Sequence, residues 1–217
     1  FSAPKVIATS SKGPSSNGHV AQRVGIVANL RPIKNIELFV RAAGRLAAAH
    51  PNAYFEIGGE GESRGLLQAL IDNLGLGGRV TLRGSVSDVP TFLRGLDVAV
   101  LCSLSEGSPN AIMEYMAAGL PTVATDVGGN AELVEHEVTG LVVPSNNEEQ
   151  LAGAIDRLLR DPALAAQYGN TARERAFASY GVEDQARRYE DFYCRIFARK
   201  TTTAIKEKAA VPSAGAA

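Results

Sequence analysis

Short apolar runs alternate along this chain with longer segments in which apolar residues recur every three or four positions. The short runs predict strands, and the periodic segments predict helices. The strand candidates are residues 23–29, 54–57, 80–83, 97–102, 121–125 and 141–143. The helix candidates are residues 35–50, 64–74, 89–95, 110–118, a short turn around Glu132, 148–160, 162–180 and 182–199. Strands separated by helices indicate βαβ units. We therefore expect an α/β fold, with a Rossmann-like parallel sheet of about six strands, helices on both of its faces and further helices at the C-terminus.

The two ends of the chain differ from its centre. Residues 1–22 are polar and rich in Ser, Gly and Pro, which predicts a linker or loop. Residues 200–217 are of low complexity and are expected to form a disordered tail. Residues 23–199 are expected to form one domain, which suits a chain of 217 residues.

Composition narrows the function classes. A hydrophobic content of 45% allows a sizeable core, and a net charge of −1 argues against nucleic acid as the main partner. Cys102 and Cys194 lie far apart, and the three histidines lack metal-ligand spacing. The sequence therefore predicts neither a disulfide framework nor a metal site, and it favours a reducing compartment. No apolar run reaches the roughly 20 residues that span a bilayer. We expect a cytoplasmic chain.

Basic residues gather late in the chain, and two interpretations of them stay open. They favour peripheral association with anionic lipid on the inner face of a membrane, or they form an ordinary solvated helix face. These residues are Arg187, Arg188, Arg195, Arg199 and Lys200.

Candidate ligand-binding residues follow the predicted strands. Ligands of open parallel sheets bind outside the carboxyl ends of the strands, so loops in these positions converge on one cleft. Arg31 and Lys34 follow the first strand and precede a helix, an arrangement that suits a pyrophosphate. The loops after the next four strands cover residues 58–62, 83–86, 103–110 and 125–130.

The most informative stretch is SLSEGSPNAIMEYMAAGLPTVATDVGGNAELV, residues 103–134. It places Glu106 in a polar loop and Glu114 in the helix that follows. A loop that runs into a helix N-terminus offers backbone N–H groups to phosphates, and flanking carboxylates accept hydrogen bonds from sugar hydroxyls. The pattern indicates one ligand class, a nucleotide joined to a sugar through phosphates.

This stretch closely resembles the donor-binding signature of the retaining glycosyltransferases of family 4, which have the GT-B fold. Tyr115 is a mild departure, because alanine is commoner at that position. The matching residues are Ser103, Glu106, Gly107, Pro109, Asn110, Glu114, Met116, Ala117, Gly119, Pro121, Gly128, Gly129, Glu132, Leu133 and Val134.

The resemblance implies roles for these residues. Glu106 would contact the hydroxyls of the donor sugar near the reacting carbon, and Glu114 would accept hydrogen bonds from the ribose. Lys34 and Arg31 would stabilise the negative charge on the departing diphosphate, so no metal and no other cofactor is expected. The family's arginine usually stands at the position of Asn29, which makes Arg31 a shifted candidate. The backbone expected near the phosphates is that of Gly107, Ser108, Pro109 and Asn110.

Two further loops are predicted to contact the donor through the resemblance. Gly59 belongs to a glycine-rich turn that would let the backbone approach the donor, although a tight turn alone also explains its glycines. Ser85 lies in the loop whose main chain would touch the nucleobase. Arg83 is a candidate for stacking on that base, and a solvated strand end is the alternative.

The resemblance covers residues 23–198 and corresponds to the carboxyl-terminal half of a GT-B enzyme. The implied activity is retaining transfer from a nucleoside-diphosphate sugar, by an enzyme whose amino-terminal, acceptor-binding domain is missing here. The acceptor, the sugar and the base stay open. The alternatives are a non-catalytic nucleotide-sugar-binding subunit and a GT-B-like nucleotide-sugar epimerase. A dinucleotide-dependent dehydrogenase is remote, because the first strand lacks the glycine fingerprint.

Overall fold

A computed structural model describes residues 21–181, 187, 189–190 and 192–195. It confirms the predicted six parallel strands, in the order β3-β2-β1-β4-β5-β6. The strands are β1 (Gln22–Val27), β2 (Ala53–Gly58), β3 (Val80–Gly84), β4 (Val98–Leu101), β5 (Thr122–Thr125) and β6 (Gly140–Val143). The helices are the 3-10 turn η1 (Pro32–Lys34), α1 (Ile36–Leu46), α2 (Arg64–Asn73), α3 (Val89–Arg94), α4 (Asn110–Ala117), α5 (Asn130–Leu133), α6 (Glu148–Arg160) and α7 (Pro162–Ser179).

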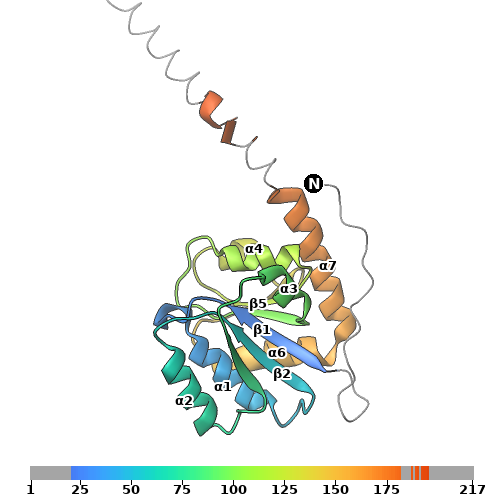
Figure 1. Ribbon diagram of the computed structural model, residues 1–217. Helices are drawn as coiled ribbons and strands as arrows, with labels where there is room; N and C mark the ends of the chain where they lie inside the picture. Colours follow the sequence, from blue (N-terminus) through green and yellow to red (C-terminus); the bar gives the residue numbers. More distant parts are fainter. Residues whose placement is uncertain (1–20, 182–186, 188, 191, 196–217) are drawn as a thin grey trace, which may run out of the picture. The chain divides into compact units, whose positions relative to one another are not determined.

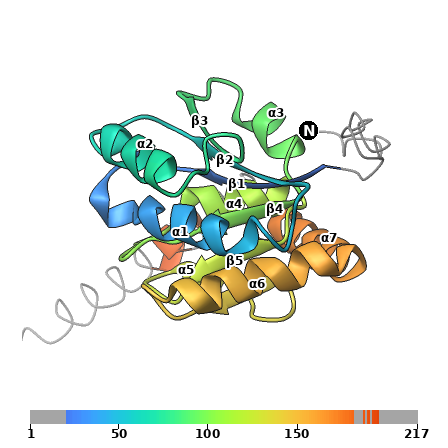
Figure 2. The same ribbon diagram turned by 90° about the horizontal axis from the view of Figure 1, so that it is seen from below.

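Helices cover both faces of the sheet, as predicted (Figures 1 and 2). α1 contacts both α2 and α6 on one face, and α6 also contacts β4, β5 and β6. α4 contacts β4 and β5 from the other face, where α3 also lies. This arrangement follows from the apolar stripe of each helix. In α1, for example, Phe39, Ala43 and Leu46 are buried, at the spacing of one helix face.

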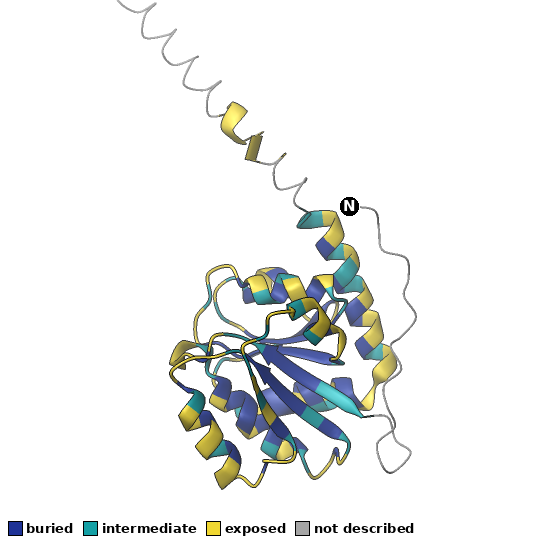
Figure 3. Cartoon of the chain, viewed as in Figure 1, coloured by how far each residue is buried: buried dark blue, intermediate teal, exposed yellow. Residues whose placement is uncertain are grey.

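The core lies along the central strands (Figure 3). Every residue of β4 and β5 is buried, as expected for parallel strands with helices on both sides. Phe39 of α1 meets Phe55 of β2 edge to face, with ring centroids 5.9 Å apart.

The chain divides into a unit up to Arg175 and a second unit from Ala176. In the first unit, α7 packs against the turn after α4, where a Cβ on Gly169 would lie 2.2 Å from the carbonyl oxygen of Gly119. In the second unit, the described residues beyond Gly181 are helical, and Tyr189, Phe192 and Tyr193 are exposed.

Three predictions from the sequence fall wholly or largely outside the described residues. The predicted linker over 1–22 is described only at Ala21 and at Gln22, where β1 already begins. The predicted helix over 182–199 is described at seven positions, and the predicted tail over 200–217 at none. In the part of the chain that is described, no helix is long and apolar enough to cross a membrane.

Candidate donor-binding site

The loops that follow β1 to β5 meet at the carboxyl edge of the sheet and are joined to one another. The N–H of Leu30 donates to the carbonyl of Glu60, and the N–H of Gly59 donates to that of Gly84. On the other side of β1, the N–H of Leu104 donates to the carbonyl of Ile33 over 2.8 Å. β1 and β4 are the neighbours at which the strand order reverses, and this is where open α/β sheets form their ligand crevice.

Lys34 is held at this crevice by the turn that carries it. Pro32 begins the 3-10 turn, and Asn35 ends it with a left-handed backbone (φ 48°). The thiol of Cys102 lies 3.2 Å from the carbonyl oxygen of Asn35 and 3.5 Å from that of Lys34. Burial raises the pKa of this thiol to about 12, so it stays protonated and donates to these carbonyls. Cys102 therefore docks the Lys34 loop onto the end of β4.

The Lys34 ammonium reaches Glu106, the carboxylate that the sequence singled out. Its Nζ lies 2.6 Å from Glu106 Oε1, and the Ser103 hydroxyl donates to the same oxygen over 2.6 Å. The Glu106 side chain is only 9% exposed, so water screens this pair little. Thr125 in turn donates to the carbonyl of Ser103. The structure thus brings together two predicted catalytic residues that are 72 positions apart in sequence.

The Gly128-Gly129 turn packs directly on the Glu106 loop. Gly128 has a φ of +50°, and a Cβ built on it would lie 1.7 Å from the carbonyl oxygen of Glu106. At Gly129 a Cβ would lie 2.4 Å from the carbonyl oxygen of Gly107. Only glycine allows these two backbones to come so close.

The predicted phosphate-binding segment leads into α4. Gly107, Ser108 and Asn110 are exposed, whereas Pro109 is buried. Pro109 occupies the N-cap position without a side-chain cap, so the first N–H groups of α4 are left for another acceptor. Glu114 is exposed on this helix.

The second loop lies beside the first, and the third lies beside the second. Gly59 has a φ of +140°, and a Cβ on it would lie 1.9 Å from the carbonyl oxygen of Ala28, so this turn requires glycine. Ser85 is exposed just after β3. A cavity of about 530 Å³ opens between the first two loops, and Arg31 lines it. The full lining is Asn29, Arg31, Glu60, Gly61 and Glu62.

Arg83 is exposed at the end of β3 and pairs with a carboxylate on the neighbouring strand. Its Nη2 and Nε lie 3.0 and 3.1 Å from the carboxylate of Glu56, which also accepts a hydrogen bond from Arg23. Glu56 is buried in β2, between β1 and β3, and therefore needs cationic partners. A lone acidic residue in an otherwise apolar strand was the signal in the sequence for this arrangement.

The Glu56 cluster predicts a pH dependence of stability. Burial raises the pKa of Glu56, but hydrogen bonds from Arg83 and Arg23 lower it further than burial raises it, so the net shift is downward. The cluster's contribution to the free energy of unfolding is then present above about pH 4.3, the ordinary Glu value, and is lost as the pH falls. In urea unfolding, Glu56→Gln should be less stable than the wild type by about 1 kcal/mol at pH 7, and by less at pH 3. The expected loss is small because both arginines are partly exposed to solvent. An equal loss at both pH values would contradict this prediction.

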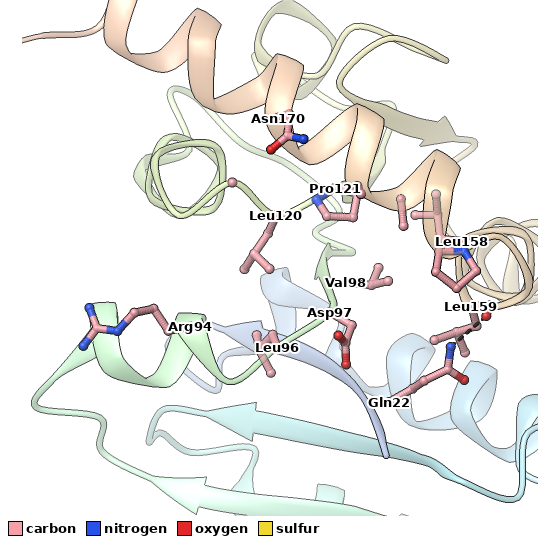
Figure 4. Close-up of a pocket in the computed structure, with 14 residues that line it drawn as sticks. Gln22, Arg94, Leu96, Asp97, Val98, Leu120, Pro121, Leu158, Leu159 and Asn170 are labelled. Atoms are coloured by element: carbon pink, nitrogen blue, oxygen red, sulfur yellow. Dashed lines mark hydrogen bonds between the residues drawn. The ribbon is translucent and has the colours of Figure 1, made fainter. Parts of the chain in front are cut away.

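A second cavity, of about 370 Å³, lies at the opposite edge of the sheet (Figure 4). Gln22 of β1, Val98 of β4 and Pro121 before β5 line it at the amino ends of their strands, together with Leu158 of α6. Gly119 and Pro121 of the signature stretch also line it, but none of the residues with a predicted role in donor binding does.

Two curated relatives show the extent of the match. An exopolysaccharide phosphotransferase of Streptomyces coelicolor is 32% identical over 79% of this chain and 18% of its own length. The alpha-D-kanosaminyltransferase of Streptomyces kanamyceticus is 34% identical over 69% of this chain and 39% of its own length. The chain therefore spans less than half the length of either relative.

Solved structures agree with the fold. The Anabaena protein HepE, solved in complex with UDP, superposes with a TM-score of 0.77 at 25% identity, over 81% of this chain and 49% of that one. The C-terminal domain of a glycosyl transferase group 1 protein from Francisella tularensis superposes with a TM-score of 0.69 at 24% identity, over 74% of this chain and 87% of that domain. These matches confirm the predicted half of a GT-B fold. The family model described as "Glycosyl transferases group 1" matches residues 18–175, more than half of the sequence, and this chain therefore belongs to that family.

Proposed function

We propose that this chain is the donor-binding part of a retaining glycosyltransferase and that it binds a nucleoside-diphosphate sugar. The observation that carries the proposal is the Lys34–Glu106 pair, which lies at the crevice between β1 and β4. A cation beside a carboxylate, next to an uncapped helix N-terminus, offers complementary partners to a diphosphate and to the hydroxyls of an attached sugar.

The diphosphate is bound by positive charge and backbone amides. Lys34 and Arg31 attract its oxygens, and the N–H groups from Gly107 to the start of α4 donate to them. Negative charge on the diphosphate increases as the bond to the sugar breaks. These donors therefore bind the departing group more tightly than the intact donor, which lowers the barrier to transfer.

The two glutamates bind the hydroxyls on either side of the phosphates. Glu106 accepts from the donor sugar and Glu114 from the ribose. Gly59 and Ser85 contribute main-chain contacts on the nucleotide side. Arg83 contacts the base only if it gives up Glu56, so we place it at the margin of the site.

The acceptor site is proposed to lie in a domain absent from this sequence. This chain matches less than half of the length of each of the two relatives. We therefore expect the chain alone to bind donor and to transfer sugar slowly or not at all. Robust transfer by the purified chain would overturn this part of the proposal.

Calorimetric titration with UDP, GDP, ADP and their sugar conjugates tests the binding function. We expect selective binding of one nucleotide, and an affinity about tenfold lower in Glu114→Ala, because the ribose loses its charged acceptor. Glu174→Ala is the matched control, since Glu174 is also an exposed helical glutamate but lies on α7. Equal affinity in the wild type and Glu114→Ala would remove Glu114 from the site.

Addition of a separately expressed amino-terminal half then distinguishes the alternatives. Restored transfer identifies the active half of an enzyme. Nucleotide binding without transfer supports a non-catalytic binding subunit, and interconversion of the donor sugar supports an epimerase.

A further inference from the structure

The hydroxyl of Tyr115 occupies a position in the sheet that a neighbouring strand would ordinarily fill. Tyr115 lies on α4 and is fully buried. Its hydroxyl oxygen lies 2.9 Å from the backbone N of Val27, from which it accepts a hydrogen bond, and 3.3 Å from the carbonyl oxygen of Val27, to which it donates. Val27 is the last residue of β1.

The pairing of β1 with its neighbours explains why Val27 needs this partner. β1 pairs with β2 along its whole length, from Gln22 to Val27, but pairs with β4 only at Val24 and Gly25. Successive residues of a strand direct their backbone groups to alternate sides, and Ala28 uses the β2 side. The groups of Val27 therefore face β4, where strand pairing has already stopped and the Tyr115 hydroxyl takes its place.

We propose that Tyr115 is a positioning residue that sets the separation of β1 and β4 at the donor crevice; this inference rests on the proposed function. Three parts of the site are connected to the contact between Tyr115 and Val27. The loop after β1 carries Lys34, the loop after β4 carries Glu106, and Glu114 is the residue before Tyr115 on α4. A single hydroxyl thus ties the helix that carries one carboxylate to the strand that leads to the ammonium.

The Tyr115 hydroxyl is suited to hold β1 and β4 at a constant separation. Burial raises the pKa of the Tyr115 phenol, so its proton stays in place to be donated to the Val27 carbonyl.

Tyr115→Phe tests the proposal, with Tyr168→Phe as its control. Both substitutions remove one hydroxyl from a buried tyrosine, but Tyr168 lies on α7, away from the crevice. We expect Tyr115→Phe to weaken UDP binding by about fivefold or more, a typical coupling between a site and a neighbouring structural element, and Tyr168→Phe to leave it unchanged. Amide hydrogen exchange should become faster at Val27 and also at Leu104. The N–H of Leu104 bonds to the carbonyl of Ile33, so its exchange measures whether the Lys34 and Glu106 loops stay joined.

Each outcome either supports or refutes the positioning role of Tyr115. Faster exchange confined to Val27, with unchanged UDP affinity, would show a local structural contact and overturn the positioning role. If the wild type does not bind UDP, the donor is not a UDP sugar, and the proposed function is tested with the other nucleotides. Unchanged exchange at Leu104 in Tyr115→Phe would refute the positioning role in that case too.

If Tyr115→Phe fails to fold, the effect of UDP on amide exchange in the wild type provides the test. UDP should slow exchange at Val27 more than at Gly25, which lies on the same edge of β1, and equal slowing would refute the coupling.

Discussion

Replacement of Gly128 with alanine is expected to destabilise the chain by about 3 kcal/mol or more, the range of severe single substitutions. The added Cβ would lie 1.7 Å from the carbonyl oxygen of Glu106, so one of the two backbones must move. The left-handed φ of +50° adds about 1–2 kcal/mol for any residue with a Cβ. Because the displaced loop carries Glu106, nucleotide binding should be lost together with stability. Urea unfolding measures the first effect and calorimetry the second.

Gly153→Ala is the matched control for this substitution. Gly153 lies in the exposed middle of α6, where an added Cβ meets no atom within 4 Å. The same chemical change should therefore stabilise the chain there, by up to about 1 kcal/mol, because alanine favours helix. Gly128→Ala unfolding at the urea concentration of the wild type would contradict the close approach of the two loops.

Lys34→Met is expected to lower the affinity for the bound nucleotide by about 100-fold, since charge-assisted hydrogen bonds contribute about 1.5–3 kcal/mol each. Two effects combine in this variant. The diphosphate loses a cation, and the nearly buried Glu106 carboxylate loses its ammonium partner, which held it in place beside the donor. Calorimetry with the nucleotide selected by the wild type measures the loss.

Arg41→Met separates a local effect from a change in net charge. Arg41 is exposed on α1, so its removal takes one positive charge from the molecule without touching the crevice. Its affinity should match that of the wild type. An equal loss in both variants would attribute the effect to net charge, and no loss in Lys34→Met would exclude Lys34 from the diphosphate site.

The order and type of the elements were predictable from the sequence because short, mostly apolar runs alternate with segments of helical periodicity. The ends of the elements were not. Residues 23–29 read as one strand, yet β1 ends at Val27. Its last backbone groups bond to the hydroxyl of Tyr115, 88 residues further along the chain. A local pattern contains no information about a partner that distant.

The candidate site, too, was predictable only in part. The strand-loop-helix pattern predicted that Lys34 and Glu106 would face one cleft, because the ends of parallel strands share an edge. The direct ion pair depends on the tertiary arrangement of the two loops, in which Cys102 and Ser103 take part. In the sequence, Cys102 is only the last residue of a predicted strand. Its role as a donor required the position of the Lys34 loop.

The hydrogen bonds between neighbouring cleft loops allow the side chains of this site to change during evolution. Three of them, Leu30 to Glu60, Gly59 to Gly84 and Leu104 to Ile33, join main-chain atoms that almost any amino acid supplies. Exposed side chains on the same loops, such as those of Glu62 and Ser85, can therefore be exchanged without the loss of any of these hydrogen bonds. Preference for one sugar or base can then drift by substitution on a constant backbone frame, with little risk to folding.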